Sequence, residues 1–254
     1  REVALPGIDQ KDGAGEDRAP GCAASGHCGP AALIPGGMPT LQLALAVSAA
    51  LVAVLAIRAH YLDESRRWQV YAFKPLATLL ILALALAFTP VRADYQWAIA
   101  AGLLFSTAGD IFLMLPRDRF VAGLASFLVA HLCYVGAFSI GVPFGAAPLL
   151  WLPFFAAGGL VLALVWPGLK PALRAPVAVY VIVIAAMAGQ APGRWHMIGS
   201  VVALAAAVGA GLFVVSDAVL AIDRFRWKFR AARAVTLATY WAAQLLIALS
   251  ISGA

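Results

Sequence analysis

Two aspartates lie within long apolar segments of this chain, where an ionisable side chain is costly. Asp110 lies in the apolar run 95–115, and Asp217 lies in the run 196–222. A carboxylate at membrane depth usually faces a polar cavity and marks a functional site. The two aspartates have similar flanking sequences, STAGDIFL and FVVSDAVL. We therefore expect paired acid/base chemistry from these two carboxyl groups.

The composition is that of a protein that crosses a membrane several times. Of 254 residues, 63% are hydrophobic and 12% are charged, and the mean hydropathy is +0.90. A soluble domain is about half apolar and about a quarter charged. The net charge of +6 reflects basic residues in short connections between apolar runs, which is typical of topology signals. The sequence therefore predicts no nucleic-acid partner.

Eight apolar runs, each near the length of about 20 residues that a bilayer requires, predict eight transmembrane helices. The runs are 40–57, 71–88, 95–115, 120–140, 148–166, 175–190, 196–222 and 233–252. Turn signals separate many of them, at 89–90, 116, 141–143, 167–168 and 191–193. The alternation of period two that marks spanning β-barrels is absent. The predicted fold class is therefore all-α, a polytopic integral membrane bundle of eight transmembrane helices.

Residues 1–37 differ in composition from the rest of the chain. They are rich in Gly, Pro and Ala, carry mixed charge and show no helical period. We expect them to form a disordered or non-native N-terminal tail, and residues 38–254 to form the transmembrane domain. Met38 directly precedes the first apolar run, which makes it the expected natural start of the protein.

The histidines and cysteines are too scattered for a metal site. They are His27, His60, His131, His196, Cys22, Cys28 and Cys133. No second pair at zinc spacing accompanies the two cysteines of the tail. His60 and His196 are predicted to lie on opposite sides of the membrane. The sequence therefore predicts no bound metal and no cofactor.

Basic residues alternate between the predicted connections. The odd-numbered connections carry 13 lysines and arginines, whereas the even-numbered connections carry only Arg92 and Arg194. Because cytoplasmic loops are enriched in these residues, the odd-numbered connections are predicted to be cytoplasmic. Both termini are then predicted to lie on the opposite side. We expect the protein to reside in a bacterial inner membrane.

This topology gathers polar side chains in the cytoplasmic half of six predicted helices, while the outer half is almost purely apolar. The gathered residues are Lys74, Ser106, Asp110, His131, Tyr134, Tyr180, Asp217, Thr236, Tyr240 and Gln244. Thr236, Tyr240 and Gln244 share one helix face because they are four residues apart. Lys74 is predicted to open the second helix at the membrane edge. We expect a polar cavity that opens toward the cytoplasmic leaflet.

These residues also have structural interpretations. Thr236 and Gln244 can link helices by hydrogen bonds, Lys74 can extend toward headgroups, and His131 can be a satisfied core histidine. The two aspartates can form a structural buried pair with a cation. A transporter needs polar positions through both membrane halves, so a dry outer half favours an enzyme. A lipid-binding or transport protein is the alternative interpretation.

Several segments resemble the YhhN family, whose animal members are the transmembrane lysoplasmalogenases. The segments are Lys74–Leu76, Gly102–Leu115, Phe127–Phe138, Pro176–Tyr180, Leu212–Leu220 and Thr239–Leu245, and the resemblance covers residues 40–250. It implies an eight-helix membrane hydrolase that acts on lysoplasmalogens with choline or ethanolamine headgroups. Cleavage of the vinyl ether gives a fatty aldehyde and a glycerophospho-base. The implied partners are the lysophospholipid substrate and the lipid bilayer, whereas headgroup preference and oligomeric state stay open.

The resemblance also implies a set of site residues. In vinyl ether hydrolysis a proton is transferred to carbon, giving an oxocarbenium ion. One carboxyl group therefore acts as the acid, and the other, ionised, stabilises the cation and activates water. The sequence does not distinguish the two aspartates; we assign Asp217 as the acid and Asp110 as the base, with His131 orienting water or relaying the proton. The implied substrate-binding residues are Lys74, near the phosphate, and Tyr134, Tyr180, Ser216, Tyr240 and Gln244.

Overall fold

The computed structural model describes residues 38–62, 67–115 and 119–253. Within these ranges, eight helical spans are long and apolar enough to cross a membrane, which confirms the predicted fold class. The helices are α1 (Thr40–Ala59), α2 (Trp68–Ala87), α3 (Ala93–Met114), α4 (Phe120–Ser139), α5 (Leu152–Val165), α6 (Pro171–Ile198), α7 (Val201–Phe225) and α8 (Ala232–Leu249). Short 3-10 helices, η2 (Pro148–Trp151), η3 (Trp166–Gly168) and η4 (Ser250–Gly253), extend α5 and α8. The predicted tail 1–37, with Cys22 and Cys28, lies outside the described residues.

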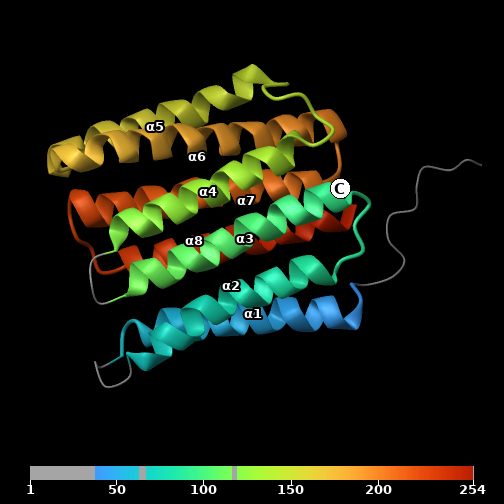
Figure 1. The fold of residues 1–254 in the computed structure, drawn as a ribbon, viewed down its shortest axis with the longest axis horizontal. Helices are drawn as coiled ribbons and strands as arrows, with labels where there is room; N and C mark the ends of the chain where they lie inside the picture. The colour runs from blue at the N-terminus through green and yellow to red at the C-terminus, as the bar shows by residue number, and fades with distance from the viewer. Residues whose placement is uncertain (1–37, 63–66, 116–118, 254) are drawn as a thin grey trace, which may run out of the picture. The chain divides into compact units, whose positions relative to one another are not determined.

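Consecutive helices run in opposite directions (Figure 1), so α1, α3, α5 and α7 all end at the same end of the bundle. We call this the odd-loop end, and the other the even-loop end. Helix α8 has a central position, because it packs against α1, α2, α3 and α7. Helix α5 is peripheral and packs on α6 and α7. The helices that carry the two aspartates, α3 and α7, both border the central α8.

Small residues bring α3 close to α4. A Cβ atom added at Gly102 would overlap the ring of Tyr134, and one added at Gly109 would lie 2.6 Å from the ring of Phe127. Aromatic rings of α4 therefore pack directly on the backbone of α3, as small residues allow in membrane helices. Asp110 follows Gly109 and is buried in the bundle, with 1% of its surface exposed.

The connection between α6 and α7 differs from the prediction. The turn expected at 191–193 is absent, and α6 continues through Pro192 to Ile198. A proline costs the helix one hydrogen bond, which neighbouring helices can offset in a membrane bundle. The chain turns instead at Gly199, whose φ of 71° forms a left-handed C-cap. The hydroxyl of Ser200 then caps α7 by accepting a bond from a backbone amide in the first turn.

Helix α2 begins earlier than predicted, at Trp68 instead of residue 71. Lys74 therefore lies six residues inside the helix, about 9 Å along its axis, and its side chain is buried. The prediction that Lys74 opens the helix at the membrane edge is wrong. The apolar run begins later than the helix because the first turn of the helix contains the polar residue Gln69.

The even-loop end contains buried polar residues, so the prediction of a dry outer half is wrong. Gln190 makes three hydrogen bonds of 3.0–3.4 Å to backbone groups at the end of α4 and in the connection after it. Arg194 donates to the carbonyl of Ile140, and its guanidinium lies 4.6 Å from the centre of the Tyr95 ring. These contacts fasten the α4–α5 connection onto α6. Their polar groups are engaged with backbone and with an aromatic ring, which is a structural role.

Candidate active site

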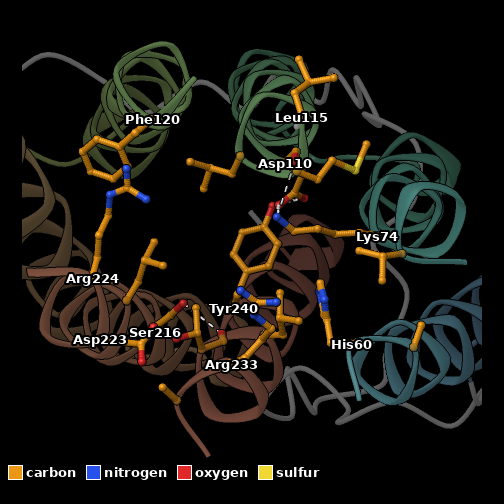
Figure 2. Close-up of a pocket in the computed structure, with 18 of the residues that line it drawn as sticks. His60, Lys74, Asp110, Leu115, Phe120, Ser216, Asp223, Arg224, Arg233 and Tyr240 are labelled. Carbon is orange, nitrogen blue, oxygen red and sulfur yellow. Dashed lines mark hydrogen bonds and ion pairs between the residues drawn. The ribbon is translucent and has the colours of Figure 1, made fainter. Parts of the chain in front are cut away.

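A polar cavity of about 510 Å³ lies at the odd-loop end, where the sequence predicts one. Buried residues of α2, α3, α7 and α8 form its inner wall, and these include Lys74, Asp110, Ser216 and Tyr240. Exposed residues such as Arg224 and Arg233 form its mouth. Figure 2 shows this arrangement, with Asp110 and Tyr240 directed toward each other inside the cavity.

Asp110 is surrounded by hydrogen-bond donors. The ammonium of Lys74 lies 3.1 Å from Oδ1 of Asp110. Oδ2 accepts hydrogen bonds of 2.8 Å from the hydroxyls of Thr78 and Tyr240. Three donors, one of them cationic, match the carboxylate form of Asp110, because an ionised carboxyl group accepts at both oxygens.

Helix geometry explains how α2 supplies two of these donors. Lys74 and Thr78 are four residues apart and therefore lie on one face of α2. The indole Nε1 of Trp241 donates a 3.2 Å bond to the hydroxyl of Thr78, which orients that hydroxyl for Asp110. Sequence reasoning missed Thr78, although its spacing from Lys74 is a usable signal. It also missed Trp241, for which an apolar helix gives no signal.

Asp217 has a different set of partners from α4 and α6. The hydroxyl of Tyr180 donates a 2.5 Å bond to Oδ2 of Asp217, and Nε2 of His131 lies 3.8 Å from the same oxygen. The other ring nitrogen of His131 lies 2.5 Å from the carbonyl of Phe127. A carbonyl oxygen only accepts, so Nδ1 of His131 carries a hydrogen.

This tautomer leaves Nε2 of a neutral His131 with a lone pair. That atom is buried and has no hydrogen-bond partner among the described residues. It lies 3.8 Å from Oδ2 of Asp217, which is longer than a direct hydrogen bond. His131 is therefore a neighbour of Asp217 with an unused polar atom, in a position to orient a third group beside that carboxyl group.

An apolar groove adjoins the polar cavity, between α4, α5, α6 and α7. Its volume is about 90 Å³. Its lining includes Leu124, Ala157, Gly158, Val161, Val177, Val181 and Ile184, and also the ring of Tyr180. The described residues common to both linings are Leu113, Phe120, Phe127, Asp217 and Leu220. Asp217 thus borders a polar space on one side and an apolar space on the other.

The remaining predicted site residues divide into two layers. Ser216 lines the cavity, and its hydroxyl donates a 3.0 Å bond to the carbonyl of Thr236. Tyr134 and Gln244 are fully buried and bond to each other, hydroxyl to Oε1, at 2.6 Å. Neither they nor His131 are among the residues that line the two spaces. These three residues therefore support the wall of the cavity from behind.

The three histidines in the described part of the chain do not converge. His60 lies just after α1 at the odd-loop end, and His196 lies near the end of α6 at the opposite end, which confirms the predicted separation. Among the residues that the structure describes, no group of three His, Cys, Asp or Glu side chains is placed to hold a metal ion.

Known proteins resemble this chain along most of its length. A model of the YhhN family matches residues 69–251. The uncharacterized membrane protein YhhN of Escherichia coli O6:H1 is 32% identical over 205 residues, which cover 81% of this chain and 97% of the relative. Lysoplasmalogenase TMEM86A of Bos taurus is 38% identical over 176 residues, covering 68% of this chain and 72% of the relative. A lysoplasmalogenase of Mycobacterium bovis is 34% identical over 184 residues, covering 69% of this chain and 67% of the relative. No solved structure matches the chain at a significant level.

Proposed function

This chain belongs to the YhhN family, and on that premise we propose that it is a lysoplasmalogenase. It hydrolyses the vinyl ether of 1-alkenyl lysophospholipids and releases a fatty aldehyde and a glycerophospho-base. Relatives that are 34–38% identical carry the name lysoplasmalogenase, and the eight spans of the described residues suit a lipid substrate.

One observation carries the proposal to specific residues: Asp217 borders both the polar cavity and the apolar groove. The vinyl ether of the substrate joins an apolar alkenyl chain to a polar glycerophosphate. A substrate with its chain in the groove and its headgroup in the cavity has this bond at the boundary between the two spaces. Asp217 is the carboxyl group at that boundary. Asp110, in contrast, lines the polar cavity and not the apolar groove.

The first chemical step is proton transfer from Asp217 to the second carbon of the alkenyl chain. This carbon becomes a methylene, and the first carbon becomes an oxocarbenium ion that shares charge with the ether oxygen. His131 and Tyr180 contact Asp217 through its Oδ2 and act as positioning residues. General acid catalysis of this kind contributes about 10²–10⁴-fold to a rate.

The second step is the addition of water to the oxocarbenium carbon. Asp110, with the contacts that match its carboxylate form, accepts a proton from this water as the hemiacetal forms. When the hemiacetal collapses, Asp110 returns the proton to the glycerol oxygen, and the hydroxyl proton passes to Asp217. The products are one aldehyde and one alcohol, and both carboxyl groups regain their starting states. The logic is that of glycosidases, which use two carboxyl groups around a similar cation.

The membrane orientation is a further part of the proposal. Basic residues concentrate at the odd-loop end, for example Arg224, Arg226, Lys228, Arg230 and Arg233 between α7 and α8. The positive-inside rule then makes this end cytoplasmic, with both termini on the other side. Labelling of Arg226→Cys by a membrane-impermeant maleimide, in a background where Cys22, Cys28 and Cys133 are replaced by serine, tests this. Labelling only after the cells are opened supports it, and labelling of intact cells contradicts it.

The test of function is aldehyde release from 1-alkenyl-glycerophosphocholine and 1-alkenyl-glycerophosphoethanolamine by purified protein. We expect turnover by the wild type and a fall in kcat of about 10³-fold in Asp217→Asn. The matched control is Asp94→Asn, because Asp94 lies on the surface at the opposite end of the bundle and pairs with Arg92. If folded wild type binds these lipids without hydrolysing them, the alternative of a lipid-binding or transport protein replaces the enzyme.

A further inference from the structure

Among the described residues that line the polar cavity, basic side chains outnumber carboxyl groups. There are five of the former and three of the latter; they are Arg67, Lys74, Arg224, Lys228, Arg233, Asp110, Asp217 and Asp223. Lys74 pairs with Asp110 at 3.1 Å, and Lys228 pairs with Asp223 at 3.5 Å. Arginines are thus a main component of the exposed part of this lining.

Two of these arginines each lie two helical turns away from a residue that lines the cavity. Arg224 follows Asp217 by seven residues on α7, and Arg233 precedes Tyr240 by seven residues on α8. Seven residues are two helical turns and about 10 Å, and they return to nearly the same helix face. Since α7 and α8 are antiparallel neighbours, both arginines are displaced toward the odd-loop end. Figure 2 shows Arg224 and Arg233 among the side chains that surround the same cavity as Asp110 and Tyr240.

His60 provides separate evidence of a positive field at the mouth. Its side chain lines the cavity. Its pKa is lowered to about 4, first by burial and then by the charges of Arg233 and Lys74. His60 is therefore neutral at pH 7. A region whose cations disfavour a further positive charge favours an anion there.

We propose that Arg233 and Arg224 form a clamp at the cavity mouth that binds the phosphodiester anion of the substrate while its vinyl ether lies beside Asp217. This inference rests on the proposed function. Guanidinium groups suit the role because they donate two parallel hydrogen bonds to phosphate oxygens. Lys74, which the sequence analysis places near the phosphate, pairs with Asp110 in this structure.

The dimensions of the substrate agree with this arrangement. Seven bonds separate the protonated alkenyl carbon from phosphorus in a 1-alkenyl-glycerophospholipid. With bonds of about 1.5 Å, that path spans about 9 Å when extended. The axial rise between Asp217 and Arg224 is about 10 Å, and a flexible arginine side chain can cover the difference. The clamp therefore selects lysophospholipids whose phosphate lies one glycerol unit away from the vinyl ether.

The test compares two substrates that share the vinyl ether and differ in the phosphate. These are 1-alkenyl-glycerophosphocholine and 1-alkenylglycerol, assayed by aldehyde release from wild type and Arg233→Gln. We expect Arg233→Gln to lower kcat/KM for the phospholipid about tenfold, through KM, and to change the value for 1-alkenylglycerol less than twofold. Arg233→Lys keeps the positive charge but cannot donate two parallel hydrogen bonds, so we expect an intermediate loss of kcat/KM. Arg224→Gln should behave like Arg233→Gln.

The matched control is Arg226→Gln. Arg226 is an exposed arginine two residues after Arg224, and it is not among the residues that line the cavity. We expect wild-type kinetics on both substrates. Equal losses on both substrates in Arg233→Gln would overturn the clamp, because they indicate a structural role or a contact with bilayer headgroups. Unchanged kinetics in Arg233→Gln on the phospholipid would also overturn it.

A binding measurement separates failure of the clamp from failure of the proposed function. Soluble glycerophosphocholine and inorganic phosphate are titrated into detergent-solubilised wild type and Arg233→Gln, and binding is followed by calorimetry. If wild type hydrolyses neither substrate yet binds glycerophosphocholine about tenfold more tightly than Arg233→Gln, the clamp stands and the proposed function fails. No binding of glycerophosphocholine to wild type would overturn the clamp. Equal or tighter binding of inorganic phosphate would identify a site for free phosphate and overturn the assignment to a headgroup.

Discussion

The ammonium of Lys74 lies 3.1 Å from Oδ1 of Asp110, and both side chains belong to the inner wall of the polar cavity. Both are nearly buried, with exposed side-chain fractions of 10% and 2%. A buried ion pair gains little net stability, because the loss of hydration offsets the attraction, but removing one partner leaves an uncompensated charge. The two side chains therefore depend on each other, because the loss of either one leaves the charge of the other without its partner.

A double-mutant cycle at this pair is expected to be strongly non-additive. Lys74→Met leaves Asp110 without its cation, so we expect the free energy of unfolding to fall by about 3 kcal/mol. Asp110→Asn leaves the ammonium unpaired and should cost a similar amount. The double variant removes both charges, so its loss should be smaller than the sum of the single losses. Thermal unfolding in detergent checks this prediction, and additive losses would show that the two charges do not interact.

The sequence predicted the bundle well because each span obeys a local rule. About 20 apolar residues cross a bilayer, and this rule located all eight spans in the described residues. The boundary between α6 and α7 was missed because Pro192 and Gly193 are strong turn signals in water. In a packed membrane bundle, neighbouring helices satisfy the backbone groups that a proline frees. The missed boundary also explains why the buried roles of Gln190 and Arg194 were not predicted, because α6 was expected to end at residue 190.

The sequence predicts which residues form the candidate site better than it predicts which of them contact one another. The apolar setting of Asp110 and Asp217 marked both as unusual, and both line the same cavity. Which donor serves which aspartate depends on how α2, α6 and α8 rotate, and that follows from tertiary packing. The arginines at the mouth were counted only as topology signals. Their distance from Asp217 and Tyr240 has meaning only once α7 and α8 are placed side by side.

Removal of the Tyr180 hydroxyl is expected to affect the chemical step. This hydroxyl donates a 2.5 Å bond to Oδ2 of Asp217. Tyr180→Phe should therefore lower kcat about tenfold, with little change in KM, and displace the pH–rate profile, which reports the protonation of the essential acid. Aldehyde release measured between pH 5 and 9 checks this.

Tyr134→Phe is the matched control for Tyr180→Phe. Tyr134 is another buried tyrosine, but its hydroxyl bonds Gln244 and contacts neither aspartate in the described hydrogen bonds. We expect a loss of stability from the unpaired Gln244, of about 1–3 kcal/mol, and an unchanged pH–rate profile. If both variants displace the profile equally, the effect belongs to the fold and Tyr180 has no special link to the acid.

Filling the apolar groove is expected to shorten the preferred alkenyl chain. Ala157 on α5 lines the groove, and Ala156 beside it does not; both are exposed on the bundle surface. Ala157→Phe should therefore lower kcat/KM for an 18-carbon alkenyl chain more than for an 8-carbon chain, because a buried methylene contributes about 0.8 kcal/mol. Ala156→Phe should leave the ratio of the two values unchanged. A uniform loss on both chains in Ala157→Phe would indicate that the chain lies elsewhere.

The pH dependence of stability should contain a contribution from His60. Its folded-state pKa is about 4, below the value of 6.5 for an ordinary histidine, so the unfolded chain binds a proton in a pH range where the folded protein does not. The free energy of unfolding must then rise with pH between 4 and 6.5. The contribution of His60 is fully present above pH 6.5 and is lost as the pH falls toward 4.

His60→Gln removes this titration and should flatten the rise of the unfolding midpoint between pH 4.5 and 6.5. His196→Gln is the control, because His196 is exposed at the even-loop end, far from Arg233 and Lys74. It should keep the wild-type slope. Since Arg233 is one of the charges that lower the pKa of His60, Arg233→Gln should flatten the slope in part. Identical slopes in wild type and His60→Gln would mean that burial and the nearby cations do not lower the pKa of His60 in the folded protein.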